Sequence, residues 1–444
     1  MVTPARRSES YRSIGHWWPK AKARVEAQLR KSPRLHRLAQ FMWRTIRWML
    51  FRCRMRLVVL FDSGIRNLDI DKTLFLPPEK IVYVSLREFE LCDFIGAVIG
   101  GDWDRLEKRF EDLDIYIAFK QVFMEKKNWN ETLFYRRFLD ALNEGEVLWG
   151  CANEDDLQQR CKNLEKLFHT IEKEGYKTQI SLSRSARFIG LGTIADDVTI
   201  SVGRRGDLLF SDGAHRLAIA KLLGLKQIPV KIVVRHREWM VFVKELLQYA
   251  RSLGGELYQP STHPDLKDIP ALHECEGRFL MIKDKISAKK GRLLDIGANL
   301  GYFCHRFEEE GFDCYAVEEL PKELYFLRKL RRAENRKFKI IAGSIFNWAQ
   351  IGEIYFDVVL ALNVFHHALK TKESYHQLAA LLRNLQMGEL FFEPPDDDDP
   401  QMKGAYKEYS RAEFVDFIMR VSSLKHAEII GKAIDGRTIY RLSH

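Results

Sequence analysis

The residues of this chain whose types and spacing could do chemistry gather first around one short strand and its turn. An apolar run at residues 293–296 predicts a buried strand, and Gly297 and Gly301 predict a turn that leads into a helix. Asp295 lies at the carboxyl end of that strand, where α/β sheets bind their ligands. A second predicted strand ends at Glu318, about 20 positions after Asp295, which is the spacing of a ribose-binding acid. The pattern therefore predicts a nucleotide-type ligand.

Further strands are predicted downstream, with helical patterns between them. They cover residues 339–344, 356–363 and 389–395, and together they predict an α/β fold with a Rossmann-like sheet. Residues 278–444, including a final helix at Ser410–Val421, resemble the class I S-adenosylmethionine-dependent methyltransferases. That resemblance implies S-adenosylmethionine as the cofactor and methyl transfer as the activity.

The resemblance also implies a role for each residue around the predicted cofactor. The glycine turn would hold the amino-acid end, Glu318 the ribose hydroxyls, and the residues after the third strand the adenine. The residue that ends the fourth strand would lie beside the sulfonium. The cofactor-binding residues implied in this way are Asp295, Gly297, Asn299, Gly301, Glu318, Ser344, Ile345 and Asn363.

Two adjacent histidines follow the fourth predicted strand. Methyl transfer to a hydroxyl needs a base, and His366 or His367 is a candidate because the imidazole pKa lies near physiological pH. The alternative is that the pair only packs at the start of a helix. An acceptor that is already an anion, such as a phosphate or a carboxylate, would need no base.

A second motif, Asp212-Gly213-Ala214-His215-Arg216, follows a predicted strand in the middle of the chain. Gly213 permits a tight turn from the strand into a helix. His215 and Arg216 then fall at the helix N-terminus, where free N–H groups and the helix dipole favour an anion. A phosphate is the natural occupant of such a turn.

Residues 156–236 around this motif resemble the ParB/sulfiredoxin superfamily in the order of their predicted elements. The resemblance implies that Asp212, Gly213, His215 and Arg216 contact phosphate and that Gln179 lines the pocket. If the domain is a kinase, its cofactor would be ATP with Mg²⁺, and Asp212 and His215 would be catalytic. The cysteine of sulfiredoxins is missing here, which disfavours sulfinate reduction. A domain that binds nucleotide without catalysis is the alternative.

The positive charge of the chain is concentrated at its N-terminus. Residues 1–66 hold 16 Lys/Arg and 3 Asp/Glu, which gives them a net charge of about +13. The whole chain has a net charge of +10, so the remaining residues together have a net charge of about −3. Arginines interleave with Trp43, Trp48 and Phe51, a pattern that suits an interfacial helix on an anionic membrane. Packing of this helix on the body of the protein or in an oligomer is the alternative. The near-neutral remainder disfavours a nucleic-acid partner.

Cysteine usage predicts a cytoplasmic protein with reduced thiols, peripheral at the inner face of the membrane if the basic helix binds there. The 7 cysteines are scattered, without a C-x-x-C pair, and no metal site is predicted. Trp103 and Trp129 lie in the least regular region, where they are either core anchors or rings that stack on sugars.

These patterns predict four parts: a basic helical segment at 1–70, a ParB-like domain at 71–255, a linker at 256–277 and a methyltransferase domain at 278–444. One hypothesis is a bifunctional enzyme that methylates a glycan or lipid-linked glycan, with a phosphorylated acceptor included, while the middle domain acts as a kinase. The other is a single-activity methyltransferase with a targeting module. Methylation of nucleic acid is a third reading, disfavoured because the chain lacks a base-clamping motif after the fourth strand.

Overall fold

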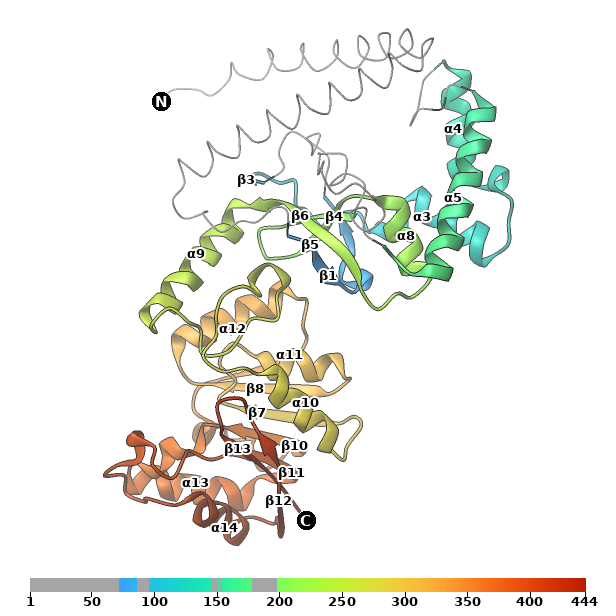
Figure 1. Cartoon of the computed structure of the whole chain (residues 1–444). Coiled ribbons are helices and arrows are strands. Elements are labelled where there is room, and N and C mark those ends of the chain that lie inside the picture. Colours follow the sequence, from blue (N-terminus) through green and yellow to red (C-terminus); the bar gives the residue numbers. More distant parts are fainter. Residues whose placement is uncertain (1–71, 86–95, 146–150, 152, 178–197) are drawn as a thin grey trace, which may run out of the picture. The chain divides into compact units, whose positions relative to one another are not determined.

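The computed structural model describes residues 72–85, 96–145, 151, 153–177 and 198–444 (Figure 1). The predicted basic helix at 1–70 and Gln179 lie outside these residues. The chain divides into two compact units, of which the second comprises residues 238–444 together with 205–207. Helix α9 therefore groups with the second unit, whereas the sequence placed the boundary after residue 255.

Unit 1 is built on a mixed sheet with the order β1-β6-β4-β5-β2, and β3 pairs in parallel with β6. Strands β4 and β6 are buried along their whole length, and most of their residues are apolar. The described elements of this unit are β1 (Leu74–Leu76), β2 (Tyr83–Val84), β3 (Ala97–Ile99), α3 (Asp114–Phe119), α4 (Leu133–Asn143), α5 (Glu154–Glu174), β4 (Val198–Val202), β5 (Leu208–Asp212), α8 (Ala214–Leu222) and β6 (Ile228–His236).

The tryptophans of unit 1 are core anchors. Trp103 is 4% exposed and Trp129 is 8% exposed. The indole N–H of Trp129 donates to Glu165 on α5 at 2.8 Å, so its polar atom is satisfied inside the protein. Stacking of these two rings on sugars is thus not their role.

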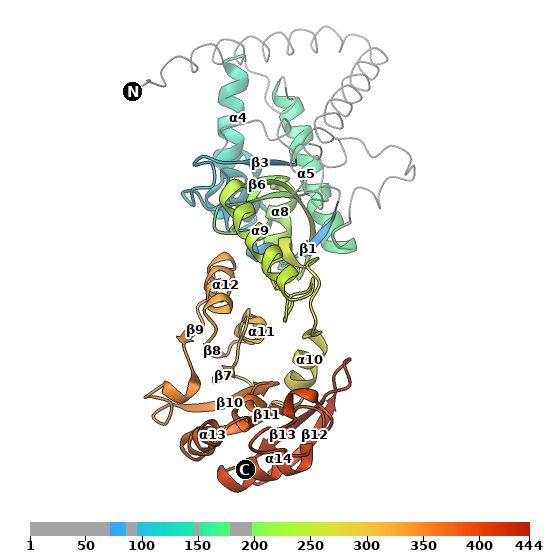
Figure 2. The same cartoon turned by 90° about the vertical axis from the view of Figure 1, so that its left-hand side faces the viewer.

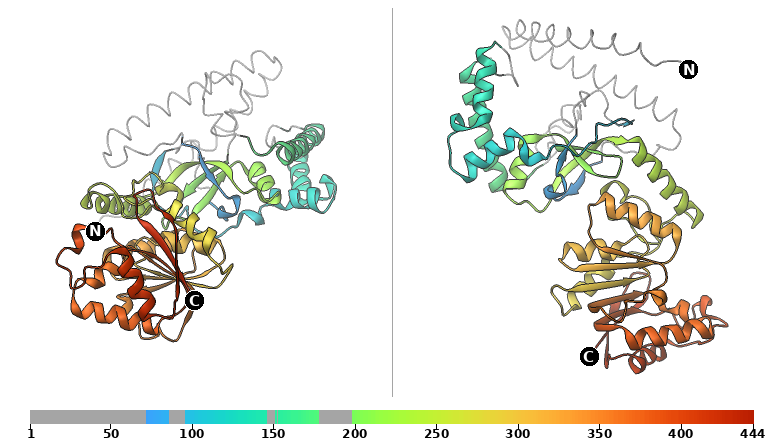
Figure 3. Two further views of the ribbon diagram at one scale, coloured as in Figure 1. Left: turned by 60° about the horizontal axis from the view of Figure 1, so that its bottom comes forward. Right: turned by 180° about the vertical axis from the view of Figure 1, so that it is seen from behind.

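Unit 2 contains a seven-stranded sheet with the order β12-β13-β11-β10-β7-β8-β9 (Figures 2 and 3). Five strands, β7 to β11, run parallel, β13 pairs antiparallel with β11, and β12 pairs antiparallel with β13. The elements of this unit are α9 (Arg237–Ser252), α10 (Glu276–Lys285), β7 (Arg292–Ile296), α11 (Tyr302–Glu309), β8 (Asp313–Glu318), α12 (Pro321–Ala333), β9 (Lys339–Ala342), β10 (Tyr355–Leu362), α13 (Lys372–Asn384), β11 (Gln386–Glu393), α14 (Arg411–Val421), β12 (His426–Lys432) and β13 (Thr438–Ser443).

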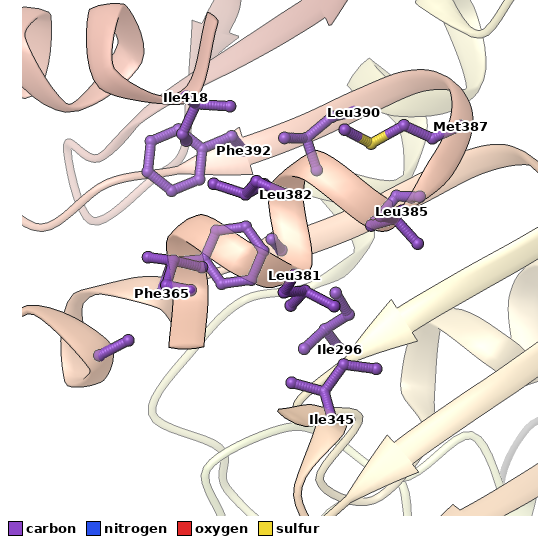
Figure 4. Packing of buried hydrophobic residues seen from close by; sticks show 14 of the residues in the cluster. Ile296, Ile345, Phe365, Leu381, Leu382, Leu385, Met387, Leu390, Phe392 and Ile418 are labelled. Atoms are coloured by element: carbon purple, nitrogen blue, oxygen red, sulfur yellow. The ribbon is translucent and has the colours of Figure 1, made fainter. Parts of the chain in front are cut away.

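Alternating side chains of the central strands form two cores on opposite faces of this sheet. Leu294 and Ile296 belong to one core with residues of α13 and α14, where Ile296 lies beside Ile345 (Figure 4). Leu293 belongs to the other core, with residues of α10 and α11. Helices on both faces confirm the α/β, Rossmann-like prediction for this part of the chain.

The segment at 256–277, predicted as a linker, is folded into unit 2. Leu257 bridges to Ala271, and Gln259 and His263 are buried. The His263 imidazole also bonds the Gly206 carbonyl oxygen at 2.9 Å. The segment has no helical or strand periodicity, so its burial was not visible in the sequence.

Candidate functional site

The carboxyl ends of the five parallel strands form one edge of the sheet, called here the carboxyl edge. At the end of β7, Gly297 has φ +77° and is exposed between buried neighbours. A Cβ at Gly297 would lie 3.0 Å from Cγ2 of Val364, the residue that follows Asn363. Gly301 has φ +83° and immediately precedes α11, and a Cβ on it would lie 2.5 Å from Leu327. Both glycines are therefore required by the turn.

Asp295 lies beneath this turn in β7 and is 3% exposed. Its carboxylate accepts a hydrogen bond from the Cys304 thiol at 3.8 Å. Burial raises the pKa of Asp295 to about 7, and the nearby charge of Glu318 adds to the effect. The carboxyl group is therefore part protonated near neutral pH.

Glu318 ends β8 and is 6% exposed. One carboxylate oxygen accepts the backbone N–H of Asn299 and the other that of Leu320, both at 2.8 Å. Burial raises the pKa of this carboxyl group, although the backbone bonds oppose the shift. Each oxygen keeps a further lone pair, so the carboxylate can still accept two hydroxyl groups.

Asn363 follows β10 and adopts φ +55°, an uncommon conformation for a residue other than glycine. Its backbone N–H donates to the Glu393 carbonyl oxygen at 3.1 Å. Its side-chain Nδ2 donates to the hydroxyl of Tyr258 at 2.6 Å. Sequence reasoning missed Tyr258, because it lies in the segment interpreted as a linker and belongs to no motif.

The two histidines differ in their surroundings. His366 is 2% exposed, and neither ring nitrogen has a hydrogen-bond partner in the described part of the chain. Burial lowers the pKa of His366 to about 3, helped by His367, whose ring centre is 4.0 Å away. His367 is exposed over much of its surface, but partial desolvation of its ring and the charge of Lys370 lower its pKa. Both imidazoles are therefore neutral at physiological pH.

Ser344 and Ile345 lie just beyond the carboxyl end of β9. Ser344 precedes the short helix η7 (Ile345–Asn347), and Ile345 is 6% exposed within the core. The preceding Gly343 donates its N–H to the Glu318 carbonyl oxygen at 2.9 Å. The loop after β9 is thereby fastened to the end of β8, next to the Glu318 carboxylate.

A buried ion-pair network lies beside Asn363 at the carboxyl edge, and it was not predicted from the sequence. Arg278 on α10 makes a bidentate contact with Glu393 at 2.8 and 3.1 Å. The same guanidinium donates to Asp435 at 2.7 Å, and Asp435 contacts His273 at 3.0 Å. The His273 ring lies edge-on against the Tyr258 ring, with 4.5 Å between centroids. The network therefore links the end of β11 to the residue that holds Asn363.

In unit 1 the structure places the second motif at a strand-to-helix turn, as the sequence predicts. Gly213 has φ +91° and precedes α8, so His215 and Arg216 lie in the first helical turn. Asp212 is exposed and accepts the Gly213 N–H at 2.7 Å. The Arg216 guanidinium lies 5.9 Å from the Tyr176 ring centre.

His215 turns toward the interior of unit 1. Its ring centre is 6.0 Å from that of Phe119. Burial lowers the pKa of His215 to about 4, and the charge of Arg160 contributes. The predicted phosphate contacts of this motif remain predictions, because no ligand contact tests them.

Acidic residues 396–399 after β11 make local contacts. Asp397 accepts the Arg411 backbone N–H at 2.7 Å and pairs with its guanidinium at 3.1 Å. Asp399 accepts the Gln401 backbone N–H at 2.9 Å. Within the described ranges, no group of three or more His, Cys, Asp or Glu side chains could hold a metal ion. None of the described helices has the length and apolar character of a membrane span.

Comparisons with solved structures give distant similarities. The bifunctional kinase-methyltransferase WbdD is 19% identical with a TM-score of 0.37, over 44% of this chain and 46% of that one. A putative O-methyltransferase from Nostoc punctiforme is 17% identical with a TM-score of 0.31, over 45% and 67%. The PH0226 protein from Pyrococcus horikoshii is 15% identical with a TM-score of 0.33, over 44% and 98%. The chain thus spans less than half of WbdD.

Sequence families give a more direct assignment. No curated protein is significantly similar in sequence to this chain. Residues 294–391, however, match the family described as "Methyltransferase domain". The match runs from β7 into β11, and it includes Asp295 in β7, Glu318 at the end of β8 and Asn363 after β10. The C-terminal part of this chain therefore contains a match to the methyltransferase domain family, over residues 294–391.

Proposed function

We propose that the methyltransferase domain transfers a methyl group from S-adenosylmethionine to a hydroxyl group. One observation carries the proposal. Three side chains at the carboxyl edge hold buried polar atoms without a hydrogen-bond partner among the described residues: Asn299 Oδ1, Asn363 Oδ1 and the His366 ring nitrogens. Buried polar atoms are normally paired, so unpaired ones on loops at the edge where α/β sheets bind ligands support a polar ligand at this edge.

The residues present fit the cofactor. The exposed Gly297 turn leaves room for the amino-acid end, and Asn299 supplies an unpaired carbonyl oxygen beside it. Glu318 retains acceptor capacity for a ribose diol, and Ile345 offers an apolar surface near the Glu318 end of the site. When bound, S-adenosylmethionine supplies an activated methyl group on a sulfonium.

His366 would act as the general base for the acceptor hydroxyl. Its ring nitrogens have no partner in the described residues, so one of them is available to accept a proton, and the lowered pKa of about 3 keeps the ring neutral but makes it a weaker base than a free imidazole. One nitrogen would take the hydroxyl proton as the oxygen forms its bond to the methyl carbon. A base is needed only for a hydroxyl acceptor, so this arrangement favours a hydroxyl over a phosphate or carboxylate.

For the acceptor we propose the hydroxyl of a glycan, free or lipid-linked, as the sequence suggested. Its test is methylation of defined oligosaccharides, with and without a lipid pyrophosphate, using cofactor labelled in the methyl group. Label in the oligosaccharide that is lost in His366→Gln supports the proposal. Label only in nucleic acid, or in carboxylates and phosphates, would exclude it.

For unit 1 we propose phosphate or nucleotide binding at Asp212–Arg216, which Gly213 supports by placing Arg216 in the first turn of α8. The two hypotheses for this unit differ in one measurement. Phosphate transfer from labelled ATP with Mg²⁺ to the glycan, lost in Asp212→Asn, indicates a kinase. Nucleotide binding without transfer indicates a targeting module.

The central experiment is calorimetry of S-adenosylmethionine with the whole protein. Binding in the micromolar range is expected, with a loss in Gly297→Val because the new side chain would meet Val364. Gly436→Val is the matched control, since Gly436 also has a positive φ but no atom lies within 4 Å of its Cβ position. Absence of binding to the wild-type protein would overturn the proposed function.

A further inference from the structure

Asn363 lies in a loop, yet both its backbone and its side chain are fixed by hydrogen bonds. Its backbone N–H is bonded to Glu393, and its Nδ2 to the Tyr258 hydroxyl at 2.6 Å. Its φ of +55° costs about 1–2 kcal/mol for a residue with a Cβ. Such strain persists only where the surrounding structure fixes it, and it is concentrated at functional sites.

These constraints leave one atom of the side chain without a partner. With Nδ2 fixed by Tyr258, Oδ1 is buried and accepts no hydrogen bond from any described residue. Val364, the next residue, lies against the Gly297 turn, since a Cβ on Gly297 would be 3.0 Å from Val364 Cγ2. Asn363 Oδ1 therefore belongs to the junction of the β7 and β10 ends, where the amino-acid part of the proposed cofactor would meet its sulfonium.

Tyr258 is itself held in place by a ring contact and the ion-pair network. Its ring lies against His273, and His273 contacts Asp435, which pairs with Arg278 and through it with Glu393. Burial raises the pKa of the Tyr258 hydroxyl, so the group stays protonated at physiological pH. The hydroxyl thus accepts from Asn363 and keeps the amide in a single orientation.

We propose that Tyr258 is a positioning residue that aims the Asn363 Oδ1 dipole at the sulfonium end of the cofactor. This inference rests on the proposed function. A carbonyl oxygen attracts a cation and has no such preference for a neutral thioether. The pair Tyr258–Asn363 would therefore make the site prefer S-adenosylmethionine to the neutral product S-adenosylhomocysteine, and so favour product release.

The test compares three ligands by calorimetry, without any acceptor. S-adenosylmethionine and S-adenosylhomocysteine differ in the positive charge, and adenosine lacks the amino-acid part. The measured quantity is the ratio of the affinity for S-adenosylmethionine to the affinity for S-adenosylhomocysteine. Tyr258→Phe should lower this ratio about 5-fold, as expected when the hydrogen bond that orients the Asn363 amide is lost. Asn363→Gly, which suits the positive φ, should lower it at least as much. Adenosine affinity should stay within 2-fold in both variants.

Matched controls separate positioning from general damage. Tyr355→Phe changes a tyrosine at the opposite end of β10, and Asn335→Gly changes an exposed asparagine with φ +51°. Neither should alter the ratio. Asn363→Asp should raise it, because a carboxylate attracts the sulfonium more strongly than an amide oxygen does.

Each outcome decides the proposal. An unchanged ratio in Tyr258→Phe with wild-type binding intact would overturn it while leaving the proposed function in place. A raised ratio would mean that the amide nitrogen faces the sulfonium, which also overturns it. If the wild type binds none of the three ligands, the proposed function fails, and the inference fails with it.

Discussion

Glu318 Oε2 accepts the backbone N–H of Asn299 at 2.8 Å, and this bond joins the loop after β7 to the end of the neighbouring parallel strand β8. The same carboxylate that is proposed to bind ribose therefore also shapes the loop that is proposed to hold the amino-acid end. The two halves of the site depend on one side chain.

The first prediction separates these two roles of Glu318. Glu318→Gln keeps an acceptor for Asn299 but replaces one carboxylate oxygen by a donor, and should weaken S-adenosylmethionine binding by about 1–3 kcal/mol. Glu318→Ala should weaken it further, because the Asn299 N–H also loses its partner. Calorimetry measures both, with exposed Glu319→Gln as control. If all three variants bind S-adenosylmethionine with the same affinity, Glu318 does not bind the ribose.

The second prediction concerns His366 as a base. His366→Gln should reduce methyl transfer by about 10²–10⁴-fold, the usual contribution of general base catalysis, while cofactor affinity changes less than 2-fold. The matched variant His367→Gln alters the exposed neighbour and should keep most activity. Initial rates at saturating cofactor provide the measurement. The reverse ranking would transfer the role to His367.

The third prediction follows from the lowered pKa of His366. The folded pKa of about 3 lies below the unfolded value near 6.5, so the unfolded state binds more protons between these values. Stability should therefore fall as pH drops from 6.5 toward 3, by up to about 1.4 kcal/mol per pH unit from this group. The unfolding free energy of the wild type minus that of His366→Gln, measured with denaturant across this range, should therefore fall as pH drops.

The fourth prediction has the opposite sign. Asp295 has a folded pKa of about 7, above its unfolded value, so its contribution to stability is present at low pH and is lost as pH rises from about 4 to 7. Asp295→Asn should remove this loss and gain stability relative to wild type as pH increases. An advantage of the variant that is independent of pH would show that the carboxyl group ionises normally. Between about pH 4 and pH 6.5 the contributions of Asp295 and His366 to stability change with pH in opposite directions. The unfolding free energy of the wild type should therefore depend less on pH in this range than that of Asp295→Asn or His366→Gln.

The fifth prediction addresses the buried pair of Arg278 and Glu393, which are 3% and 1% exposed. Arg278→Ala leaves a buried carboxylate unpaired and should cost about 3–5 kcal/mol of unfolding free energy. The exposed Arg328→Ala on α12 should cost less than about 0.5 kcal/mol. Replacing both partners, as Arg278→Met with Glu393→Leu, should recover most of the loss. Failure to recover would assign the cost to the Asp435 contact instead.

Two predictions from the sequence remain for the rest of the chain. Arg216→Ala should weaken ATP binding to unit 1 by about 1.5–3 kcal/mol, measurable as a smaller thermal shift.

A chain that begins at Leu68 should keep its methyl-transfer activity but no longer sediment with anionic vesicles, since about 1 kcal/mol of binding free energy per basic residue is lost. Unfolding of the shortened chain would favour the packing interpretation of the N-terminal helix.

The backbone of the methyltransferase domain could be predicted because its signals are local. The apolar runs that end at Ile296 and Leu362 and the glycines at 297 and 301 each determine a strand or a turn within a few residues. Helix α14 was predictable from Ser410, whose side chain accepts the Glu413 N–H in a capping box.

The contacts that complete the site were not predictable, because they join distant residues without a shared pattern. Tyr258 and Asn363 are 105 positions apart, and Arg278 and Glu393 are 115 apart. Nothing in a lone tyrosine indicates which asparagine it will hold. The unequal burial of His366 and His367 was equally hidden, since adjacent residues on a short helix face different directions.

The outermost strand of the large sheet has a consequence for association between molecules. Among the described strands β12 pairs only with β13, so within this part of the chain its other side offers backbone groups to which another strand could pair. Ile429 is 62% exposed there, but Glu428, Lys432 and a register shift between Ile429 and Gly431 interrupt the strand. Charges and irregularities of this kind keep solvent-facing strands from polymerising. Substitution of Glu428 and Lys432 by valine should therefore convert this edge into a nucleus for fibrous aggregation without any change at the site of chemistry.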